Sequence, residues 1–141
     1  MALEKLATVL RALQLYGQHA HNNCAGKSFI PDHDMFASSY QAAADAYDSV
    51  VERIIGSTGK PVDTMEISLQ AIKLTASCSR NPGECNTEFL RGVLKLELAT
   101  CVHIDQLCES RSLPEGTRQL IGDIADKSMS RQYKLKQRLK E

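Results

Sequence analysis

Two histidines lie twelve residues apart in the stretch HNNCAGKSFIPDH, which runs from His21 to His33. Imidazole nitrogens are frequent metal ligands, and a second pair of candidate ligands follows downstream. Asp48 and Glu52 are four residues apart, so in a helix both carboxylates project from the same face. Two imidazoles and two carboxylates form a donor set that suits iron. The pattern therefore predicts a metal site if folding or assembly brings the two pairs together.

A plainer interpretation of the same residues stays open. Carboxylates at this spacing also occur on solvated helix faces, where Arg53 or Arg11 would serve as their ion-pair partners. A histidine close to a loop is often a surface residue. The metal hypothesis therefore depends on the four residues taken together.

Apolar residues recur at helical spacing and predict four long helices. A shorter apolar pattern between Thr64 and Thr75 predicts a brief additional helix, and the alternation typical of strands is absent. Pro31 fits the first turn of the second long helix, and the GSTGKP segment at 56–61 ends that helix. The long helices are expected over 3–20, 28–56, 90–108 and 117–139.

The connection lengths predict how these helices pack. The first two and the last two are joined by short segments, which favour antiparallel neighbours, whereas about thirty residues separate the second helix from the third. Such a segment can run the length of a bundle. We therefore predict an all-α protein with a single domain over 1–141, an antiparallel four-helix bundle of the ferritin-like kind whose long crossover contains the short helix.

The predicted second helix separates the two pairs of candidate ligands within one chain. His33 lies fifteen residues before Asp48, a rise of about 22 Å along a straight helix, so one chain cannot bring both to one metal. Two copies of this helix packed antiparallel across a two-fold axis would join the His33 end of one chain to the Asp48 and Glu52 end of the other. His21 would join His33, and the site would occur twice per dimer.

Composition narrows the class of partner. Lys and Arg number 17, as do Asp and Glu, so no net field attracts the chain to nucleic acid or to a membrane surface. The N-terminal segment is too charged for a signal peptide, and the five cysteines contain no CxxC motif, which predicts a cytoplasmic chain with reduced thiols. Cys78 and Cys85 flank a turn, and a disulfide or a soft-metal site is the alternative to a reduced pair there. Cys24 lies near His21 in sequence and is either a target of oxidation by peroxide or a residue that packs in the loop.

Two sequence regions resemble the signatures of the Dps mini-ferritins. The family patterns are His-Trp-Asn-x-x-Gly-x-x-Phe-x-x-x-His and, later, Asp-x-x-x-Glu-Arg, and HNNCAGKSF followed by His33 and then DSVVER at 48–53 are similar to them. The ending LPEGTRQLIGDIADKSMSRQYKLKQRLKE also resembles the last helix of the family. The spacings agree at His21, Asn23, Gly26, Phe29, His33, Asp48, Glu52 and Arg53.

This resemblance implies a homo-oligomer, a hollow shell of twelve subunits built from two-fold dimers. It implies ferroxidase sites at the dimer interfaces, where Fe(II) is bound and oxidised, typically by hydrogen peroxide, while ferric mineral collects inside and oxidative damage is limited. The implied metal ligands are His21 and His33 of one chain with Asp48 and Glu52 of its neighbour, and Glu52 is the expected bridge between two irons. No catalytic residue beyond the metal ligands is implied.

The chain departs from the family pattern at two positions. The family usually has an Asp four residues after the second His, where this chain has Ala37, and its Trp after the first His is Asn22 here. The lost carboxylate should weaken Fe(II) binding, leaving a single-iron or slow centre, with His19 as a candidate supplementary ligand. A structural shell with a degraded ferroxidase centre is the alternative that Ala37 keeps open.

The resemblance also suggests two further features. Asp126 and Asp123 in the last helix are candidates for lining a pore through which iron enters, although a solvated helix face explains them nearly as well. Relatives that compact DNA commonly use a flexible Lys-rich tail, which is not evident before Leu3. DNA binding by the basic C-terminal helix end is therefore an alternative that we do not favour, because these cations also complement the helix dipole.

Overall fold

The computed structural model describes residues 2–140, and helices account for most of them. No strand occurs in that range, as the sequence predicts, and none of its helices is long and apolar enough to cross a membrane. A single 3-10 turn follows the third helix. The elements are α1 (Ala2–Asn23), α2 (Phe29–Thr58), α3 (Thr64–Leu74), η1 (Thr75–Ser77), α4 (Asn86–Cys108) and α5 (Glu115–Leu139).

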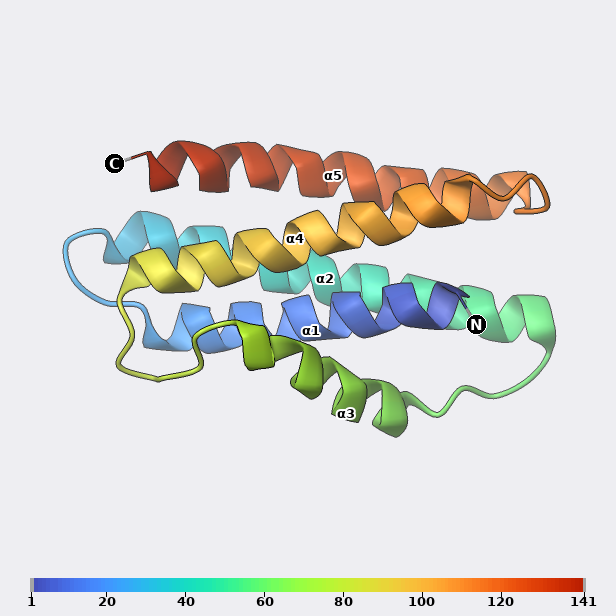
Figure 1. Cartoon of the computed structure of the whole chain (residues 1–141), viewed down its shortest axis with the longest axis horizontal. Helices are drawn as coiled ribbons and strands as arrows, with labels where there is room; N and C mark the ends of the chain where they lie inside the picture. Colours follow the sequence, from blue (N-terminus) through green and yellow to red (C-terminus); the bar gives the residue numbers. More distant parts are fainter. Residues whose placement is uncertain (1, 141) are drawn as a thin grey trace.

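The four long helices lie side by side, and α3 packs on the outer side of α1 (Figure 1). Short connections join α1 to α2 and α4 to α5 as antiparallel pairs, and the segment 59–85 crosses from one end of the bundle to the other. The predicted ferritin-like bundle with a long crossover is thus confirmed. Several helix ends lie a few residues outside the predicted ranges, since α1 continues to Asn23, α2 continues to Thr58, α4 begins at Asn86 rather than near Leu90, and α5 begins at Glu115.

Glycines with a left-handed backbone border the helix that carries most of the candidate ligands. Gly26 has φ 87° in the loop before α2, and its carbonyl oxygen accepts a hydrogen bond from the backbone N–H of Phe29 at 3.1 Å. Gly59 has φ 70° after α2, and its N–H donates to the carbonyl oxygen of Ile55 at 2.8 Å, a common way to end a helix. Between them α2 runs unbroken for 30 residues.

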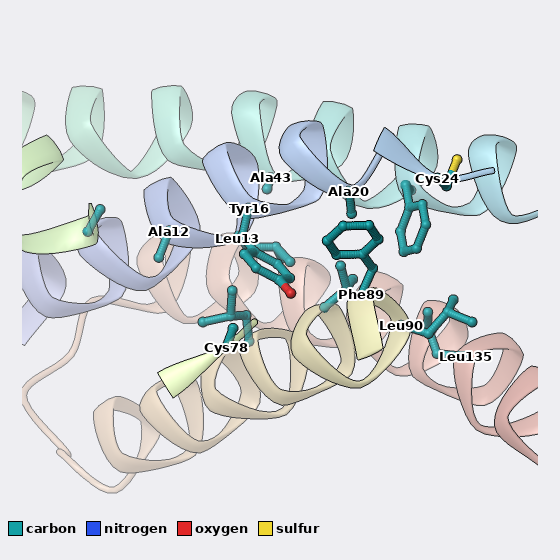
Figure 2. Packing of buried hydrophobic residues seen from close by; sticks show 14 residues of the cluster. Ala12, Leu13, Tyr16, Ala20, Cys24, Ala43, Cys78, Phe89, Leu90 and Leu135 are labelled. Carbon is teal, nitrogen blue, oxygen red and sulfur yellow. The ribbon is translucent and has the colours of Figure 1, made fainter. Parts of the chain in front are cut away.

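The core consists of two apolar clusters, one toward each end of the bundle. In the first cluster, drawn in Figure 2, Tyr16 of α1 and Phe89 of α4 meet edge to face with ring centroids 6.4 Å apart. The Tyr16 hydroxyl donates to the carbonyl oxygen of Ser79 at 2.7 Å. A Cβ at Gly92 would lie 2.5 Å from the Tyr16 ring, so α1 and α4 approach this closely because residue 92 has no side chain.

The short helix α3 buries only one of its sides. Ile67 and Ala71 are buried, whereas Met65 and Leu69 are 76% and 56% exposed and Ile72 is exposed as well. Apolar side chains gathered on one accessible helix face are typical of a surface that another chain covers. The sequence pattern predicts this helix but does not reveal which of its faces stays uncovered.

Candidate metal centre

The two candidate histidines meet at the turn between α1 and α2. His21 lies in the last turn of α1 and His33 near the start of α2, and their imidazole rings stack with centroids 3.7 Å apart and an interplanar angle of 26°. The ring of Phe29 stacks on the His33 ring at 4.8 Å, and the Tyr40 ring lies 5.2 Å from the His21 ring. The loop therefore brings the two imidazoles together within one chain, as predicted.

A hydrogen bond fixes how His21 presents its ring. Its Nδ1 lies 2.9 Å from the backbone carbonyl oxygen of His33, which only accepts, so the Nδ1 atom carries the proton. In the neutral imidazole the Nε2 atom then has a free lone pair and is the metal-binding nitrogen. An imidazole binds a metal in the plane of its ring, and two stacked rings do not share one such position. The pair therefore suits two separate metal ions, or one ion after a ring rotates.

The two candidate carboxylates lie further along α2 and are accessible. Asp48 and Glu52 are both exposed, and neither makes a salt bridge within residues 2–140. The arginines that would have paired with them on a plain helix face bond elsewhere. Arg53 donates to the Thr117 hydroxyl at 3.2 Å, and Arg11 donates to the side chains of Ser68 and Gln14. Both carboxylates are thus free to bind a cation.

Within one chain the imidazoles and the carboxylates stay apart. His33 and Asp48 lie on the same unbroken helix, which separates them by about 22 Å at the usual rise per residue. No group of three or more candidate metal ligands forms within the described range 2–140. A site that contains all four residues therefore requires a second chain, and that arrangement remains a prediction.

Comparison with solved structures identifies the fold that carries these residues. No family model and no curated protein matches the sequence. The structure of Dps from Microbacterium arborescens in its high iron form matches with a TM-score of 0.85 and 22% identity, covering 99% of this chain and 91% of that one. The chain has the fold of a Dps subunit. Two further solved structures share this fold. A mutant of Dps1 from Mycobacterium smegmatis matches with a TM-score of 0.81 and 17% identity, covering 98% of this chain and 92% of that one. Dps92 from Deinococcus radiodurans matches with a TM-score of 0.78 and 21% identity, covering 96% of this chain and 81% of that one.

Position 37 lacks the carboxylate that the Dps signature places one helical turn after the second histidine. Ala37 is half-buried on α2, on the same side of the helix as His33. The acids that flank His33 do not replace it. Asp32 is fully buried and bonds to Arg138, while Asp34 is exposed with its Oδ1 3.9 Å from Nδ1 of His33.

His19 does not supplement this group in the structure. Its ring packs against Phe89 and Tyr16 with centroids 5.7 and 6.1 Å away. Its Nε2 atom is buried and has no hydrogen-bond partner in the described part of the chain. His19 therefore lies among the aromatic side chains of the core rather than in the stacked histidine pair.

The acidic residues proposed for a pore lie on the exposed side of α5. Asp123 and Asp126 line a shallow hollow with Gly116 and Gly122. The Asp123 carboxylate accepts from Lys127 at 3.0 Å, one turn along the helix. No salt bridge to Asp126 occurs within residues 2–140, so Asp126 is the better placed of the two to attract a cation.

The five cysteines are all reduced in the structure. Burial raises the pKa of the Cys24 thiol, and the nearby Asp32 carboxylate adds to the shift. Burial also raises the pKa of the Cys78 thiol. Cys85 is exposed, while Cys101 and Cys108 are half-buried. Since the thiolate is the reactive form, the raised pKa values make Cys24 and Cys78 poor targets for oxidants at neutral pH.

Thiol labelling should reproduce this order. We expect a maleimide at pH 7 to modify Cys85 first and to modify Cys24 and Cys78 at least about tenfold more slowly, because those two are both inaccessible and protonated. Peptide mass mapping over time measures each rate, and labelling in denaturant serves as the control. Equal rates at all three positions in the folded protein would contradict the assignment.

Two ion pairs that are buried in the structure are not predicted from the sequence. Asp32 pairs with Arg138, and Glu97, fully buried in α4, pairs with Arg131 and accepts from the hydroxyls of Ser39 and Ser128. Glu97 interrupts the apolar stripe of its helix, and a carboxylate in such a position is a sequence signal of a buried ion pair. Both arginines belong to the basic end of α5, so the surface available to bind DNA carries less charge than the sequence suggests.

Proposed function

We propose that the chain is a subunit of a Dps-type mini-ferritin that binds Fe(II) between two-fold-related subunits, oxidises it and stores ferric mineral in a hollow shell. One observation carries the proposal. His21 and His33 stack at one end of α2, and two exposed carboxylates lie about four turns further along the same helix. The fold is that of solved Dps structures, one of which is described as a high iron form.

The proposed site takes His21 and His33 from one subunit and Asp48 and Glu52 from its partner. Imidazole and carboxylate together suit Fe(II), and carboxylates also hold Fe(III) after oxidation. If each stacked histidine held its own ion, Glu52 of the partner subunit would be the carboxylate shared between the two irons. The missing carboxylate at Ala37 removes one anionic ligand from the proposed site, which should weaken Fe(II) binding.

The oxidation balances with hydrogen peroxide as the oxidant. Two Fe(II) ions each give one electron, the O–O bond of one peroxide molecule breaks, and two protons complete two water molecules. Hydrolysis of the Fe(III) products to oxyhydroxide then releases protons to solvent. If both electrons reach one peroxide molecule together, from two irons held at one centre, hydroxyl radical is not released and the reaction would limit oxidative damage. The chain itself contributes metal ligands and no other reacting group.

The shell is part of the same proposal. The exposed apolar side of α3, with Met65, Leu69 and Ile72, is suited to contact with another subunit. Two-fold contacts would complete the metal sites, and twelve subunits would enclose the mineral, with Asp126 and Asp123 at a pore through which iron enters. A cytoplasmic location fits reduced cysteines and iron as substrate.

Iron oxidation by purified protein tests the proposal. Fe(II) is added without oxygen, hydrogen peroxide follows, and ferric absorbance is recorded. We expect the parent to oxidise the iron and keep it soluble, and the His33→Ala/Glu52→Ala variant to react at least about tenfold more slowly because each half of the site loses a ligand. His103→Ala/Glu109→Ala, which removes the same residue types elsewhere, should behave as the parent does.

The opposite result points to the alternatives. If the parent and the His33→Ala/Glu52→Ala variant oxidise iron at the same rate, the intersubunit centre is wrong, and a structural shell or a DNA-binding role becomes the better account. Three exposed cations remain at the end of α5 for DNA, Lys134, Lys136 and Lys140. A gel shift at low salt, where phosphate contacts are strongest, distinguishes these two alternatives.

A further inference from the structure

One buried carboxylate lies beside the histidine pair without joining it. The Asp32 side chain is fully buried in the first turn of α2. Its Oδ1 accepts from Nε of Arg138 at 3.0 Å, and its Oδ2 accepts from a terminal nitrogen of Arg138 at 3.1 Å and from Nδ2 of Asn86 at 2.9 Å. This bidentate pair with an added amide satisfies a charge that would otherwise be costly to bury.

The same asparagine also holds the loop between the two histidines. The backbone N–H of Ala25 donates to Oδ1 of Asn86 at 3.0 Å, and Nδ2 of Asn86 donates to the carbonyl oxygen of Ala25 at 2.8 Å. Figure 1 shows that this loop, the start of α4 and the end of α5 meet at one end of the bundle. The start of α4 and the end of α5, both far away in the sequence, thus hold the turn between α1 and α2.

The fixed turn orients the metal-binding ring. Asp32 precedes His33 in the chain, and its backbone N–H donates to the carbonyl oxygen of Ser28 at 3.0 Å. The carbonyl oxygen of His33 is the group that accepts from Nδ1 of His21 and leaves the Nε2 atom for metal. A change in the position of this turn would therefore move the acceptor on which the orientation of His21 depends.

We propose that Asp32, Arg138 and Asn86 are positioning residues that preorganise the His21–His33 pair for metal binding. The inference rests on the proposed function for the identity of the metal, while the orientation of the rings can be measured without it. Through Arg138 the end of α5 holds the histidine half of the site, although no residue of α5 belongs to the candidate ligands. Partners that hold a metal-binding histidine commonly raise metal affinity by about tenfold to a hundredfold.

The test removes the ion pair without leaving a charge buried alone. Asp32→Asn/Arg138→Met neutralises both partners, and Glu97→Gln/Arg131→Met does the same to the other buried pair as a matched control. Nitrogen-15 NMR of the imidazoles reports the protonated nitrogen of His21, and anaerobic titration with Co(II) reports affinity by its absorption spectrum. Arg138→Lys keeps the charge but not the bidentate geometry.

We expect Nδ1 of His21 to be protonated in the parent and in the Glu97 control, and both ring forms to occur in Asp32→Asn/Arg138→Met. Co(II) affinity should fall by about tenfold or more only in that variant, and Arg138→Lys should lie between it and the parent. Asn86→Ala should change the His21 spectrum in the same direction, and it replaces the double variant if that variant fails to fold.

Two results overturn the inference. An unchanged His21 spectrum in a folded Asp32→Asn/Arg138→Met variant shows that the turn does not depend on the pair, and an equal loss of affinity in the Glu97 control shows a general effect of stability. If Co(II) binds to none of the proteins, the proposed metal site is wrong. The His21 spectrum then still decides whether Asp32, Arg138 and Asn86 position the His21 ring.

Discussion

Mixing two inactive variants should restore iron oxidation if the metal centre lies between subunits. One chain carries His21→Ala/His33→Ala and keeps its carboxylates, and the other carries Asp48→Ala/Glu52→Ala and keeps its histidines. In a two-fold dimer of the two, one of the two sites joins intact histidines to intact carboxylates, while the other site lacks all four ligands. Each variant alone has only half-sites. The structure motivates this test because one unbroken helix separates the two halves within a chain.

The expected recovery has a definite size. Random pairing makes about half of the dimers in a shell mixed, and each mixed dimer has one complete site of two. A shell of twelve subunits that contains both chains should therefore recover about a quarter of the parent activity, and an isolated doubly tagged dimer about a half. The two chains are expressed together with different affinity tags, purified through both, and assayed for peroxide-dependent Fe(II) oxidation. Doubly tagged assemblies that stay inactive would refute an intersubunit centre, whereas activity in either variant alone would show that its remaining half suffices.

The fold could be predicted because its signals are local. Apolar periodicity predicts the four long helices, and the lengths of the connections predict the antiparallel pairs and the crossover. The predicted positions of the helix ends are less accurate, since these ends depend on single residues. The αL cap at Gly59 lets α2 continue to Thr58, and α4 starts at Asn86, before its apolar stripe, because that turn is held by the bonds from Asn86 to Ala25.

Only part of the candidate site could be predicted from the sequence. His21 and His33 are joined by one short loop, so their proximity followed from the helix boundaries, whereas the ring stacking and the bond to the His33 carbonyl depend on atomic positions. From the sequence alone, Asp32 is an acid near the start of a helix, where the helix dipole favours a negative charge. Its partner Arg138 lies 106 residues away, and no local pattern links the two. Long-range polar pairs of this kind emerge only when the bundle is assembled.

Restoring the missing carboxylate should strengthen the centre. Ala37→Asp places an acid one helical turn after His33, on the same side of α2, where the Dps signature has one. One more anionic ligand close to the metal should tighten Fe(II) binding by about tenfold or more, equivalent to about 1.4 kcal/mol, because attraction between unit charges at contact distance exceeds this in a partly buried site. Anaerobic titration measures affinity, and stopped-flow absorbance after peroxide measures the rate.

Two control substitutions separate ligation from charge. Ser38→Asp adds the same charge at the next, exposed position, about 100° around the helix, and Ala37→Asn adds a side chain of the same shape without the charge. If Ser38→Asp raises affinity as much as Ala37→Asp, the effect is general electrostatic attraction. If neither changes it, position 37 does not face the metal, and the histidines bind iron without a carboxylate from their own chain. A gain confined to Ala37→Asp would show that the centre is otherwise complete and that its activity is limited by one ligand, because a degraded site would need more than one residue to recover.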